Sequence, residues 1–236
     1  MTPGTRILCI SAGTNDPSNS ATLAAAFAEG CQSIPGVSTE TAILRNLYIE
    51  HFTIEHYHKS CQTNDDFCAL QEKIEQAHGV VIATPIWNFS VPAHLKNIID
   101  RIGAFALDEE THSRGQLKGK PFSFIFTGGA PLIAWKALMY ITTMHLSEAV
   151  KYYDGTVISR HFEPKCMLGR GQFGLVVNQR PKSLTKMRRD GARFARIVQH
   201  YAQSGKLPLR NRLRHGLFTW LYRCGNRIMY PVSRFQ

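Results

Sequence analysis

The sequence predicts an α/β protein built on a doubly wound, five-stranded parallel sheet with helices on both faces. Five short apolar segments alternate with segments of helical periodicity, which is the first observation behind this prediction. The second is composition, because 236 residues with 44% hydrophobic and 19% charged residues suffice to bury a core. The third is that no uncharged apolar run reaches the roughly 18 residues that a membrane-spanning helix needs.

Each predicted strand is a short apolar run beside a turn signal. Residues 79–84 are the clearest case, since they are β-branched and uncharged and Pro85 follows them. The five predicted strands are residues 6–10, 37–44, 79–84, 121–127 and 156–159.

Apolar spacing and end signals predict the helices. Ser18, Asn19 and Ser20 offer N-caps to an Ala-rich segment. Asp65 and Asp66 place acids in the first turn of the next helix, as the helix dipole favours. The predicted helices are residues 22–30, 65–78, 92–102, 132–150 and 182–203, and residues 46–64 form a long polar connection.

Positive charge is concentrated in the last quarter of the chain. The net charge is +11, yet residues 178–236 hold 14 Lys or Arg and one acid, whereas residues 1–177 hold 14 Lys or Arg and 16 acids. We therefore expect one domain at residues 1–205 and a basic, amphipathic, helical C-terminal extension at residues 206–236. The asymmetry favours an acidic partner surface for the basic part.

The extension has the pattern of a basic amphipathic helix. Its apolar residues fall on one side of a helical projection: Leu209, Leu213, Leu217, Trp220, Leu221, Cys224 and Ile228. Three alternatives are open: this side packs on the domain or across a dimer, it binds an anionic membrane surface or an acidic partner, or it binds nucleic acid. Nucleic acid is the weakest alternative, because no recognised nucleic-acid module accompanies the charge.

Cysteine usage and the N-terminal segment indicate the compartment. The six cysteines are scattered without a CxxC pair, and the N-terminus has no signal-peptide pattern. We expect a cytoplasmic protein with reduced thiols, peripheral to the membrane if the extension binds lipid. A cluster of metal-capable residues (His51, His56, His58, Cys61 and Cys68) lacks the ligand spacing of a zinc site, so we predict no metal.

The loops that follow the strands are where a ligand is expected. In an open parallel sheet, ligands bind beyond the carboxyl ends of the strands, next to the topological switch point. The loop at residues 11–20 combines hydroxyl groups, a glycine and a helix N-terminus, which suits a phosphate. It lacks the Walker lysine and the GxGxxG spacing. A capped turn without a ligand is the alternative for this loop.

Two further loops follow strands at this edge of the sheet, and the first of them suits a flat ring. Residues 84–92 place two aromatic residues, two prolines and Asn88 after a buried strand. The alternative is that Trp87 or Phe89 covers the core or a subunit contact. In the second, at residues 127–131, Gly128 and Gly129 let backbone approach a ligand closely. By itself this loop is an ordinary turn.

Taken together, these loops resemble the NAD(P)H-dependent FMN reductase family of flavodoxin-like flavoproteins, over residues 5–160. The motifs that carry the resemblance are Ser18-Asn19-Ser20-x-x-Leu23, Thr84-Pro85-Ile86-Trp87-Asn88-x-Ser90-x-Pro92-x-x-Leu95-Lys96-Asn97-x-x-Asp100-Arg101, Leu117-Lys118-Gly119-Lys120-Pro121 and Thr127-Gly128-Gly129. The resemblance implies a flavodoxin-like fold with strand order 2-1-3-4-5, non-covalent FMN, NADPH or NADH as reductant, and a homodimer with flavin sites near the interface.

The resemblance also assigns the residues of the site. The FMN phosphate would be held by Ser11, Gly13, Ser18, Asn19 and Ser20. The isoalloxazine ring would be bordered by Pro85, Ile86, Trp87 and Asn88 and, on another side, by Thr127, Gly128 and Gly129. Many family members have an Arg in the first loop where this chain has Thr14-Asn15-Asp16, so neutralisation of the phosphate falls to the helix dipole and backbone amides.

The implied chemistry resides in the cofactor. Hydride passes from NAD(P)H to flavin N5 and on to a small-molecule acceptor such as a quinone, an azo compound, a flavin, a metal ion or a biosynthetic intermediate. No catalytic side chain is required. His94 could face a substrate, and the alternative, which we favour, is an ordinary surface histidine. The alternatives are a flavodoxin-type electron carrier and a flavin-less scaffold of the same fold.

Overall fold

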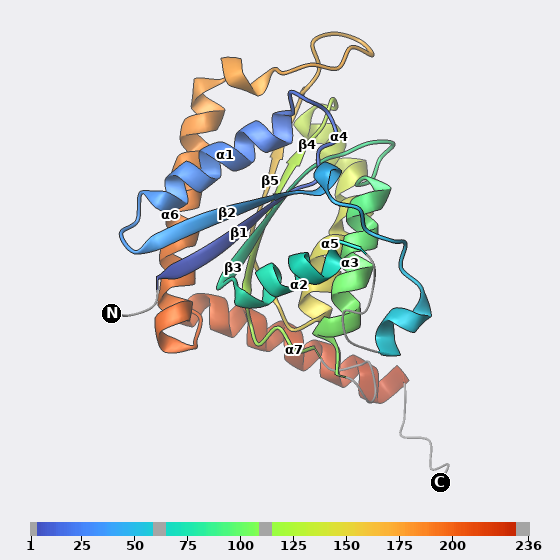
Figure 1. Cartoon of the computed structure of the whole chain (residues 1–236), viewed down its shortest axis with the longest axis vertical. Coiled ribbons are helices and arrows are strands. Elements are labelled where there is room, and N and C mark those ends of the chain that lie inside the picture. Colours follow the sequence, from blue (N-terminus) through green and yellow to red (C-terminus); the bar gives the residue numbers. More distant parts are fainter. Residues whose placement is uncertain (1–3, 59–64, 109–114, 230–236) are drawn as a thin grey trace.

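The computed structural model describes residues 4–58, 65–108 and 115–229. Its centre is a five-stranded parallel sheet in the order β2-β1-β3-β4-β5 (Figure 1). The strands are β1 (Thr5–Ser11), β2 (Val37–Ile43), β3 (Gly79–Pro85), β4 (Pro121–Thr127) and β5 (Thr156–Glu163). The predicted fold class and strand order are confirmed.

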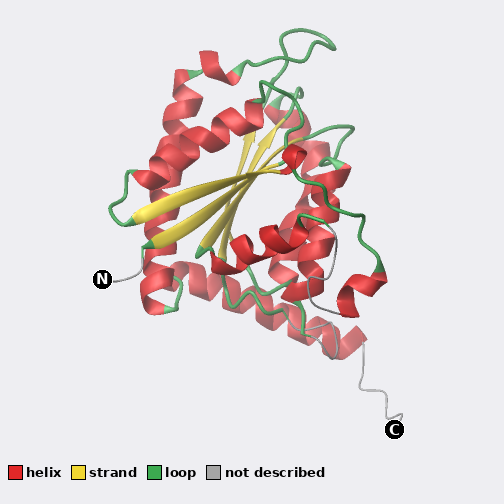
Figure 2. Cartoon of the chain, in the orientation of Figure 1, coloured by secondary structure: helices red, strands yellow, loops and turns green. Residues whose placement is uncertain are grey.

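Helices cover both faces of the sheet (Figure 2). One face is covered by α1 (Asn19–Gln32) and α6 (Pro181–Ser204), and the other by α2 (Phe67–Gln76), α3 (Ala93–Ala106) and α5 (Tyr140–Tyr152). The remaining helical elements are η1 (Leu44–Asn46), η2 (Ile54–His58), α4 (Leu132–Ala134), the π-helical turn η3 (Trp135–Met139), η4 (Val177–Gln179) and α7 (Leu209–Met229).

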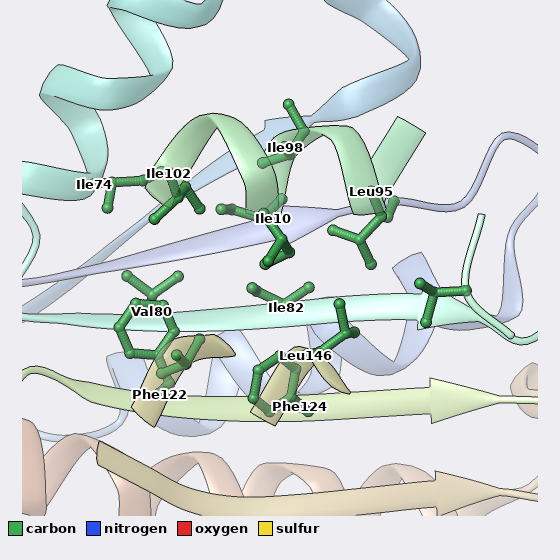
Figure 3. Close-up of a cluster of buried hydrophobic side chains, with 14 of the residues drawn as sticks. Ile10, Ile74, Val80, Ile82, Leu95, Ile98, Ile102, Phe122, Phe124 and Leu146 are labelled. Carbon is green, nitrogen blue, oxygen red and sulfur yellow. The ribbon is translucent and has the colours of Figure 1, made fainter. Parts of the chain in front are cut away.

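The strands feed two separate cores, because successive side chains of a strand point to opposite faces. On β3, Val80 and Ile82 belong to the core beneath α2, α3 and α5, whereas Val81 and Ala83 belong to the core beneath α1 and α6. Figure 3 shows the first core, where Ile82 lies among side chains from neighbouring strands and from α3. Full burial of such a side chain contributes about 1.5–3 kcal/mol.

Two glycines let α1 and α6 approach each other closely. A methyl group at Gly30 would overlap the carbonyl oxygen of Arg188, and one at Gly191 would overlap that of Phe27. The rings of Phe27 and Phe194 then pack with centroids 5.7 Å apart. This contact fastens the basic helix α6 to the sheet.

The start of α2 differs from the prediction, because its acids have other partners. Asp65 Oδ2 lies 2.8 Å from Arg101 Nη1, and both side chains are almost fully buried. The Arg101 guanidinium also lies 4.4 Å from the centre of the Phe67 ring. Asp66 Oδ2 accepts a hydrogen bond from the Tyr48 amide. The helix therefore begins at Phe67, and the two carboxylates tie α2 to α3 and to the preceding connection.

β5 is longer than predicted. It continues past Ser159 to Glu163, because Arg160 and His161 interrupt the apolar pattern without interrupting the ladder with β4. The extra length carries the chain to the carboxyl edge of the sheet, where the other strands also end.

In the described part of the C-terminal extension, α7 crosses the amino ends of the strands (Figure 1). α6 ends at Gly205, whose left-handed conformation (φ 66°) turns the chain. Leu207 is buried, and α7 starts at Leu209. Within the described ranges, no helix has the length and apolar character required to cross a membrane.

Candidate functional site

An open pocket lies at the carboxyl edge of the sheet, opposite α7. The pocket encloses about 520 Å³ of space, part of which is open solvent. Its walls are Gly13, Asn15, Ser18, Asn19, Ser20, Pro85, Ile86, Trp87, Thr127, Gly128, Gly129, Cys166, Met167, Phe173 and Gly174. Every predicted site residue except Ser11 and Asn88 is therefore in the wall of one pocket.

The first wall is the turn between β1 and α1. Ser18 caps α1, accepting a hydrogen bond from the Ala21 amide at 3.3 Å, and its hydroxyl lies 3.1 Å from that of Ser20. A methyl group at Gly13 would overlap the Ser18 hydroxyl and lie 2.8 Å from that of Ser20. The bare glycine thus leaves both hydroxyls at the pocket. The Ser11 hydroxyl, at the end of β1, is buried and has no hydrogen-bond partner among the described residues.

Asn19 has a role that the sequence did not suggest. Its side-chain amide donates to the Gly174 carbonyl at 2.7 Å, and its Oδ1 accepts from the amides of Val176 and Val177 at 2.8 and 3.1 Å. The side chain therefore joins the β1–α1 turn to the segment after β5. Its backbone amide precedes the first intrahelical hydrogen bond and is the part of Asn19 suited to an anion.

A cation reaches the first turn from elsewhere in the sequence. Arg45 of η1 donates to the Asn15 carbonyl at 3.1 Å and to Asp16 Oδ2 at 2.8 Å. Asp16 is 75% exposed and paired with this guanidinium, so its negative charge is offset at the rim of the pocket. The β1–α1 turn itself contains no Arg, and Arg45 approaches it from η1.

The second wall follows β3 and ends in a tight turn. Trp87 and Ser90 exchange two backbone hydrogen bonds, of 2.8 and 3.0 Å, across Asn88 and Phe89. Both central residues are left-handed, with φ of 48° and 69°, as this kind of two-residue turn requires. For Phe89 that conformation is strained. Asn88 is exposed at the tip of the turn, while Trp87 faces the pocket.

The third wall follows β4 and joins the others by backbone hydrogen bonds. The Ile86 amide donates to the Thr127 carbonyl at 2.7 Å, and the Gly128 amide donates to the Glu163 carbonyl at 3.1 Å. A methyl group at Gly129 would overlap the sulfur of Met167. The absence of side chains at these glycines is what keeps this wall open.

The fourth wall, after β5, was not predicted from the sequence. It contributes Cys166, Met167, Phe173 and Gly174. The signal that could have found it is the rule used for the other loops, since all strands of a parallel sheet end at the same edge.

A buried carboxylate holds this fourth wall in place. Glu163 accepts hydrogen bonds from Arg180 at 2.8 Å and from Ser183 at 2.9 Å, and it lies 3.2 Å from His161 Nε2. Burial alone would raise the pKa of Glu163, but these partners outweigh it and lower the pKa to about 2. Arg180 also donates to the carbonyls of Pro164 and Lys165, both at 2.7 Å.

Two side chains near the pocket, Cys166 and His94, belong to residue types that often take part in catalysis. Burial raises the pKa of the Cys166 thiol to about 11, so it is protonated at neutral pH and is not a nucleophile. His94 is half-buried and its Nε2 lies 2.8 Å from the Ala12 carbonyl, so one side of its ring is held against the end of β1. In the described part of the chain, no three His, Cys, Asp or Glu side chains are grouped to hold a metal; Cys61 lies outside that part.

Comparison with known families identifies this architecture. The family model described as NADPH-dependent FMN reductase matches residues 5–160, which include β1 to β4, the start of β5 and three of the four walls. The chain belongs to this family. The predicted family is therefore confirmed, and the chain shares its ancestry with NAD(P)H-dependent oxidoreductases.

The matched relatives cover limited stretches. A quinone reductase of Escherichia coli is 37% identical over 92 residues, 39% of this chain and 43% of that protein. An iron–sulfur flavoprotein of Archaeoglobus fulgidus is 37% identical over 60 residues, 25% of this chain and 31% of that protein. The chain thus spans less than half the length of these relatives.

Solved structures share the fold at low sequence identity. A flavone reductase covers 86% of this chain and is itself 66% covered, with a TM-score of 0.63 and 19% identity. RosB with bound 8-demethyl-8-formylriboflavin-5'-phosphate covers 98% of this chain and is 89% covered, with a TM-score of 0.66 and 14% identity. An archaeal flavodoxin gives a TM-score of 0.52 at 12% identity, covering 83% of this chain with all of its own length. The fold is flavodoxin-like.

Proposed function

We propose that this protein binds FMN non-covalently in the pocket and is an NAD(P)H-dependent oxidoreductase that reduces a small-molecule acceptor. The observation that carries the proposal is the convergence of four strand-end loops on one open pocket in a chain of the FMN reductase family. One wall has anion-binding chemistry and two others are lined by an aromatic residue and glycines. This division suits a ligand with a phosphate at one end and a flat ring at the other.

The β1–α1 turn fits the phosphate. It offers the Ser18 and Ser20 hydroxyls, the first amides of α1 and the partnerless Ser11 hydroxyl nearby. Arg45 holds the turn in shape through Asn15 and offsets the negative charge of Asp16, which would otherwise oppose a phosphate. These groups would bind the phosphate without the loop arginine that many family members have.

The remaining walls fit the ring. Pro85, Ile86 and Trp87 would border one side of it, and Thr127, Gly128 and Gly129 would border another. The strained Asn88-Phe89 turn is fastened to α5, because Thr142 Oγ1 donates to the Phe89 carbonyl and Ser90 donates to the Thr142 carbonyl at 3.3 Å. The turn is thereby fixed before a ligand arrives, which reduces the entropy lost on binding.

The chain's contribution to the reaction is binding and positioning. Bound FMN supplies hydride transfer between NAD(P)H and the acceptor. The walls hold the ring, exclude water from its covered side and leave the open mouth for the nicotinamide and the acceptor in turn. The proposal assigns no proton-transfer role to Cys166 or His94.

We further propose a homodimer formed by the rim beside the pocket. Large apolar side chains are exposed there: Phe89, Leu132, Ile133, Leu138 and Ile141. These residues, called the α4–α5 rim below, have Lys136 as their one charged neighbour between Leu132 and Ile141. An apolar surface with so little charge suits a second copy of the same chain and would shelter the pocket mouth.

Reconstitution tests the cofactor assignment. The purified protein is incubated with FMN, freed of excess by gel filtration and examined for flavin absorbance that co-elutes with protein. Stoichiometric FMN supports the proposal, and protein that elutes without flavin under all conditions contradicts it. A protein that binds FMN but oxidises NAD(P)H only when a separate reductase is added would be an electron carrier instead.

A further inference from the structure

The helix α7 turns its largest apolar side chains away from the protein. Leu209, Leu213, Leu217, Trp220 and Leu221 are between 54 and 65% exposed. Their spacing of three or four residues places them along one side of the helix. These five residues are called the α7 stripe. Packing of this side on the domain was one of the alternatives from the sequence. The five side chains of the α7 stripe do not pack on the domain.

The opposite side of α7 holds the helix in this orientation. His215 Nδ1 lies 3.0 Å from Thr156 Oγ1, and its Nε2 lies 3.2 Å from Asp154 Oδ1. The Lys151 ammonium lies 4.6 Å from the centre of the Phe218 ring. A polar pair and a cation–π contact therefore attach α7 to the start of β5 and the end of α5, while its leucines face outward.

Arginines border the stripe on both sides. By helical spacing, Arg210 and Arg214 lie along one border and Arg212 along the other, and all three are exposed. The helix contains no Asp or Glu, and Asp190 is the last acid of the chain. An apolar strip between two cationic borders is the arrangement of helices that lie flat in a membrane interface.

We propose that α7 docks this protein on an anionic lipid surface. The leucines and Trp220 enter the boundary of the acyl chains, and Arg210, Arg212 and Arg214 lie among the headgroup phosphates. Charge decides between this occupant and a second copy of the chain. Two α7 stripes in contact would bring their arginines together, and neither helix has an acid to offset the repulsion. In contrast, each arginine is attracted to the negative charge of an anionic leaflet.

The position of α7 makes this docking compatible with the pocket. α7 is attached at Asp154 and Thr156, at the amino end of β5, whereas the pocket is formed around Thr127 and Gly128 at the carboxyl end of β4. In Figure 1, α7 lies at the opposite end of the sheet from the carboxyl ends of the strands. A lipid surface under α7 therefore leaves the pocket open to water. The proposal does not depend on what the pocket binds.

Flotation of the full-length protein with vesicles tests the proposal. We expect it to float with vesicles of phosphatidylcholine and phosphatidylglycerol at low salt and to stay behind with phosphatidylcholine alone. The Trp220 emission should shift to the blue on binding, and Trp220→Phe should lose this shift while still floating. Leu213→Asn with Leu217→Asn should weaken binding more than about tenfold, since two large apolar side chains no longer enter the lipid.

Matched variants test whether vesicle binding depends on the α7 stripe and its arginines in particular, or on any exposed apolar or positively charged residue. Ile54→Asn with Leu168→Asn removes two apolar side chains of similar or greater exposure elsewhere and should bind as the wild type does. Arg210→Gln with Arg214→Gln should weaken binding several-fold more than Arg193→Gln with Arg196→Gln, which removes the same charge from exposed positions on α6.

Three results would overturn the proposal. The first is equally poor flotation of the wild type with anionic and neutral vesicles at low salt. The second is equal loss of binding in the Leu213/Leu217 variant and in its Ile54/Leu168 control. The third is an oligomer of the wild type that becomes monomeric in the Leu213/Leu217 variant, which would make the stripe a contact between copies of the chain.

Discussion

The two ends of the sheet both expose large apolar side chains, but their surroundings differ. At the carboxyl end, the α4–α5 rim lies beside a pocket made of loops that are joined to one another by backbone hydrogen bonds. At the amino end, the α7 stripe lies on a helix attached by a few side-chain contacts and bordered by arginines. Exposed apolar area alone does not identify a partner. The charge at its border distinguishes a surface suited to a second copy from one suited to anionic lipid.

The largest expected effect is on assembly at the carboxyl end. Ile133→Asp with Ile141→Asp places two carboxylates in the α4–α5 rim, and we expect the dimer to dissociate more than about 100-fold more readily because each charge would be buried there. Sedimentation velocity measures the change. Leu213→Asp with Leu217→Asp is the matched change at the amino end and should leave the dimer intact. If the second pair breaks the dimer and the first does not, the assignment of the two ends is reversed.

A methyl group added at the carboxyl end or at the amino end of the sheet should show which end of the sheet binds FMN. Gly13→Ala places the methyl against the Ser18 and Ser20 hydroxyls, so we expect FMN affinity to fall roughly tenfold to a hundredfold as hydrogen bonds to the phosphate are lost. Gly216→Ala on α7 has open space around it and should bind FMN like the wild type. Fluorescence titration of FMN gives both affinities. Unchanged affinity in Gly13→Ala would move the phosphate away from the β1–α1 turn.

Glu163, the buried carboxylate behind the fourth wall of the pocket, should make the free energy of unfolding depend on pH. The pKa of Glu163 is lowered in the folded protein, so its contribution is complete above its ordinary pKa of 4.5 and is lost as pH falls towards about 2. Glu163→Gln should therefore lower the free energy of unfolding by about 1–3 kcal/mol at neutral pH. Urea unfolding at several pH values measures the difference between the two proteins, which should shrink below pH 4.5. A difference that stays constant down to pH 3 would show that Glu163 acts through shape rather than charge.

The sequence was informative where chemistry is local. Apolar runs and turn residues predicted all five strands, and the position of ligand sites at strand ends predicted that Gly13, Trp87 and Gly128 share one pocket. It was less informative where a contact joins distant segments. Asp65 could not be separated from an ordinary helix-starting acid without knowing that Arg101 is buried against it. The approach of Arg45 to Asp16 likewise depends on where β2 ends beside β1.

The sequence also could not predict the direction in which some side chains point. Helical periodicity placed Leu213, Leu217 and Trp220 on one side of α7, but periodicity cannot say whether that side faces the protein or the solvent. The contacts of His215 and Phe218 decide it. Similarly, the motif that contains Asn88 could not reveal that this residue sits in a left-handed turn, exposed at the tip and outside the pocket walls. Its contact with the flavin ring stays a prediction.

The proposed function requires that the pocket at the carboxyl end hold a flavin that NAD(P)H can reduce. It is tested by anaerobic addition of NADPH, and of NADH in a parallel sample, to the protein reconstituted with FMN. We expect at least one of the two nucleotides to bleach the visible absorbance of the bound flavin, and a quinone or an azo compound added afterwards to restore it. Bound flavin that stays oxidised in the presence of both nucleotides would show that the protein is not an NAD(P)H-dependent reductase.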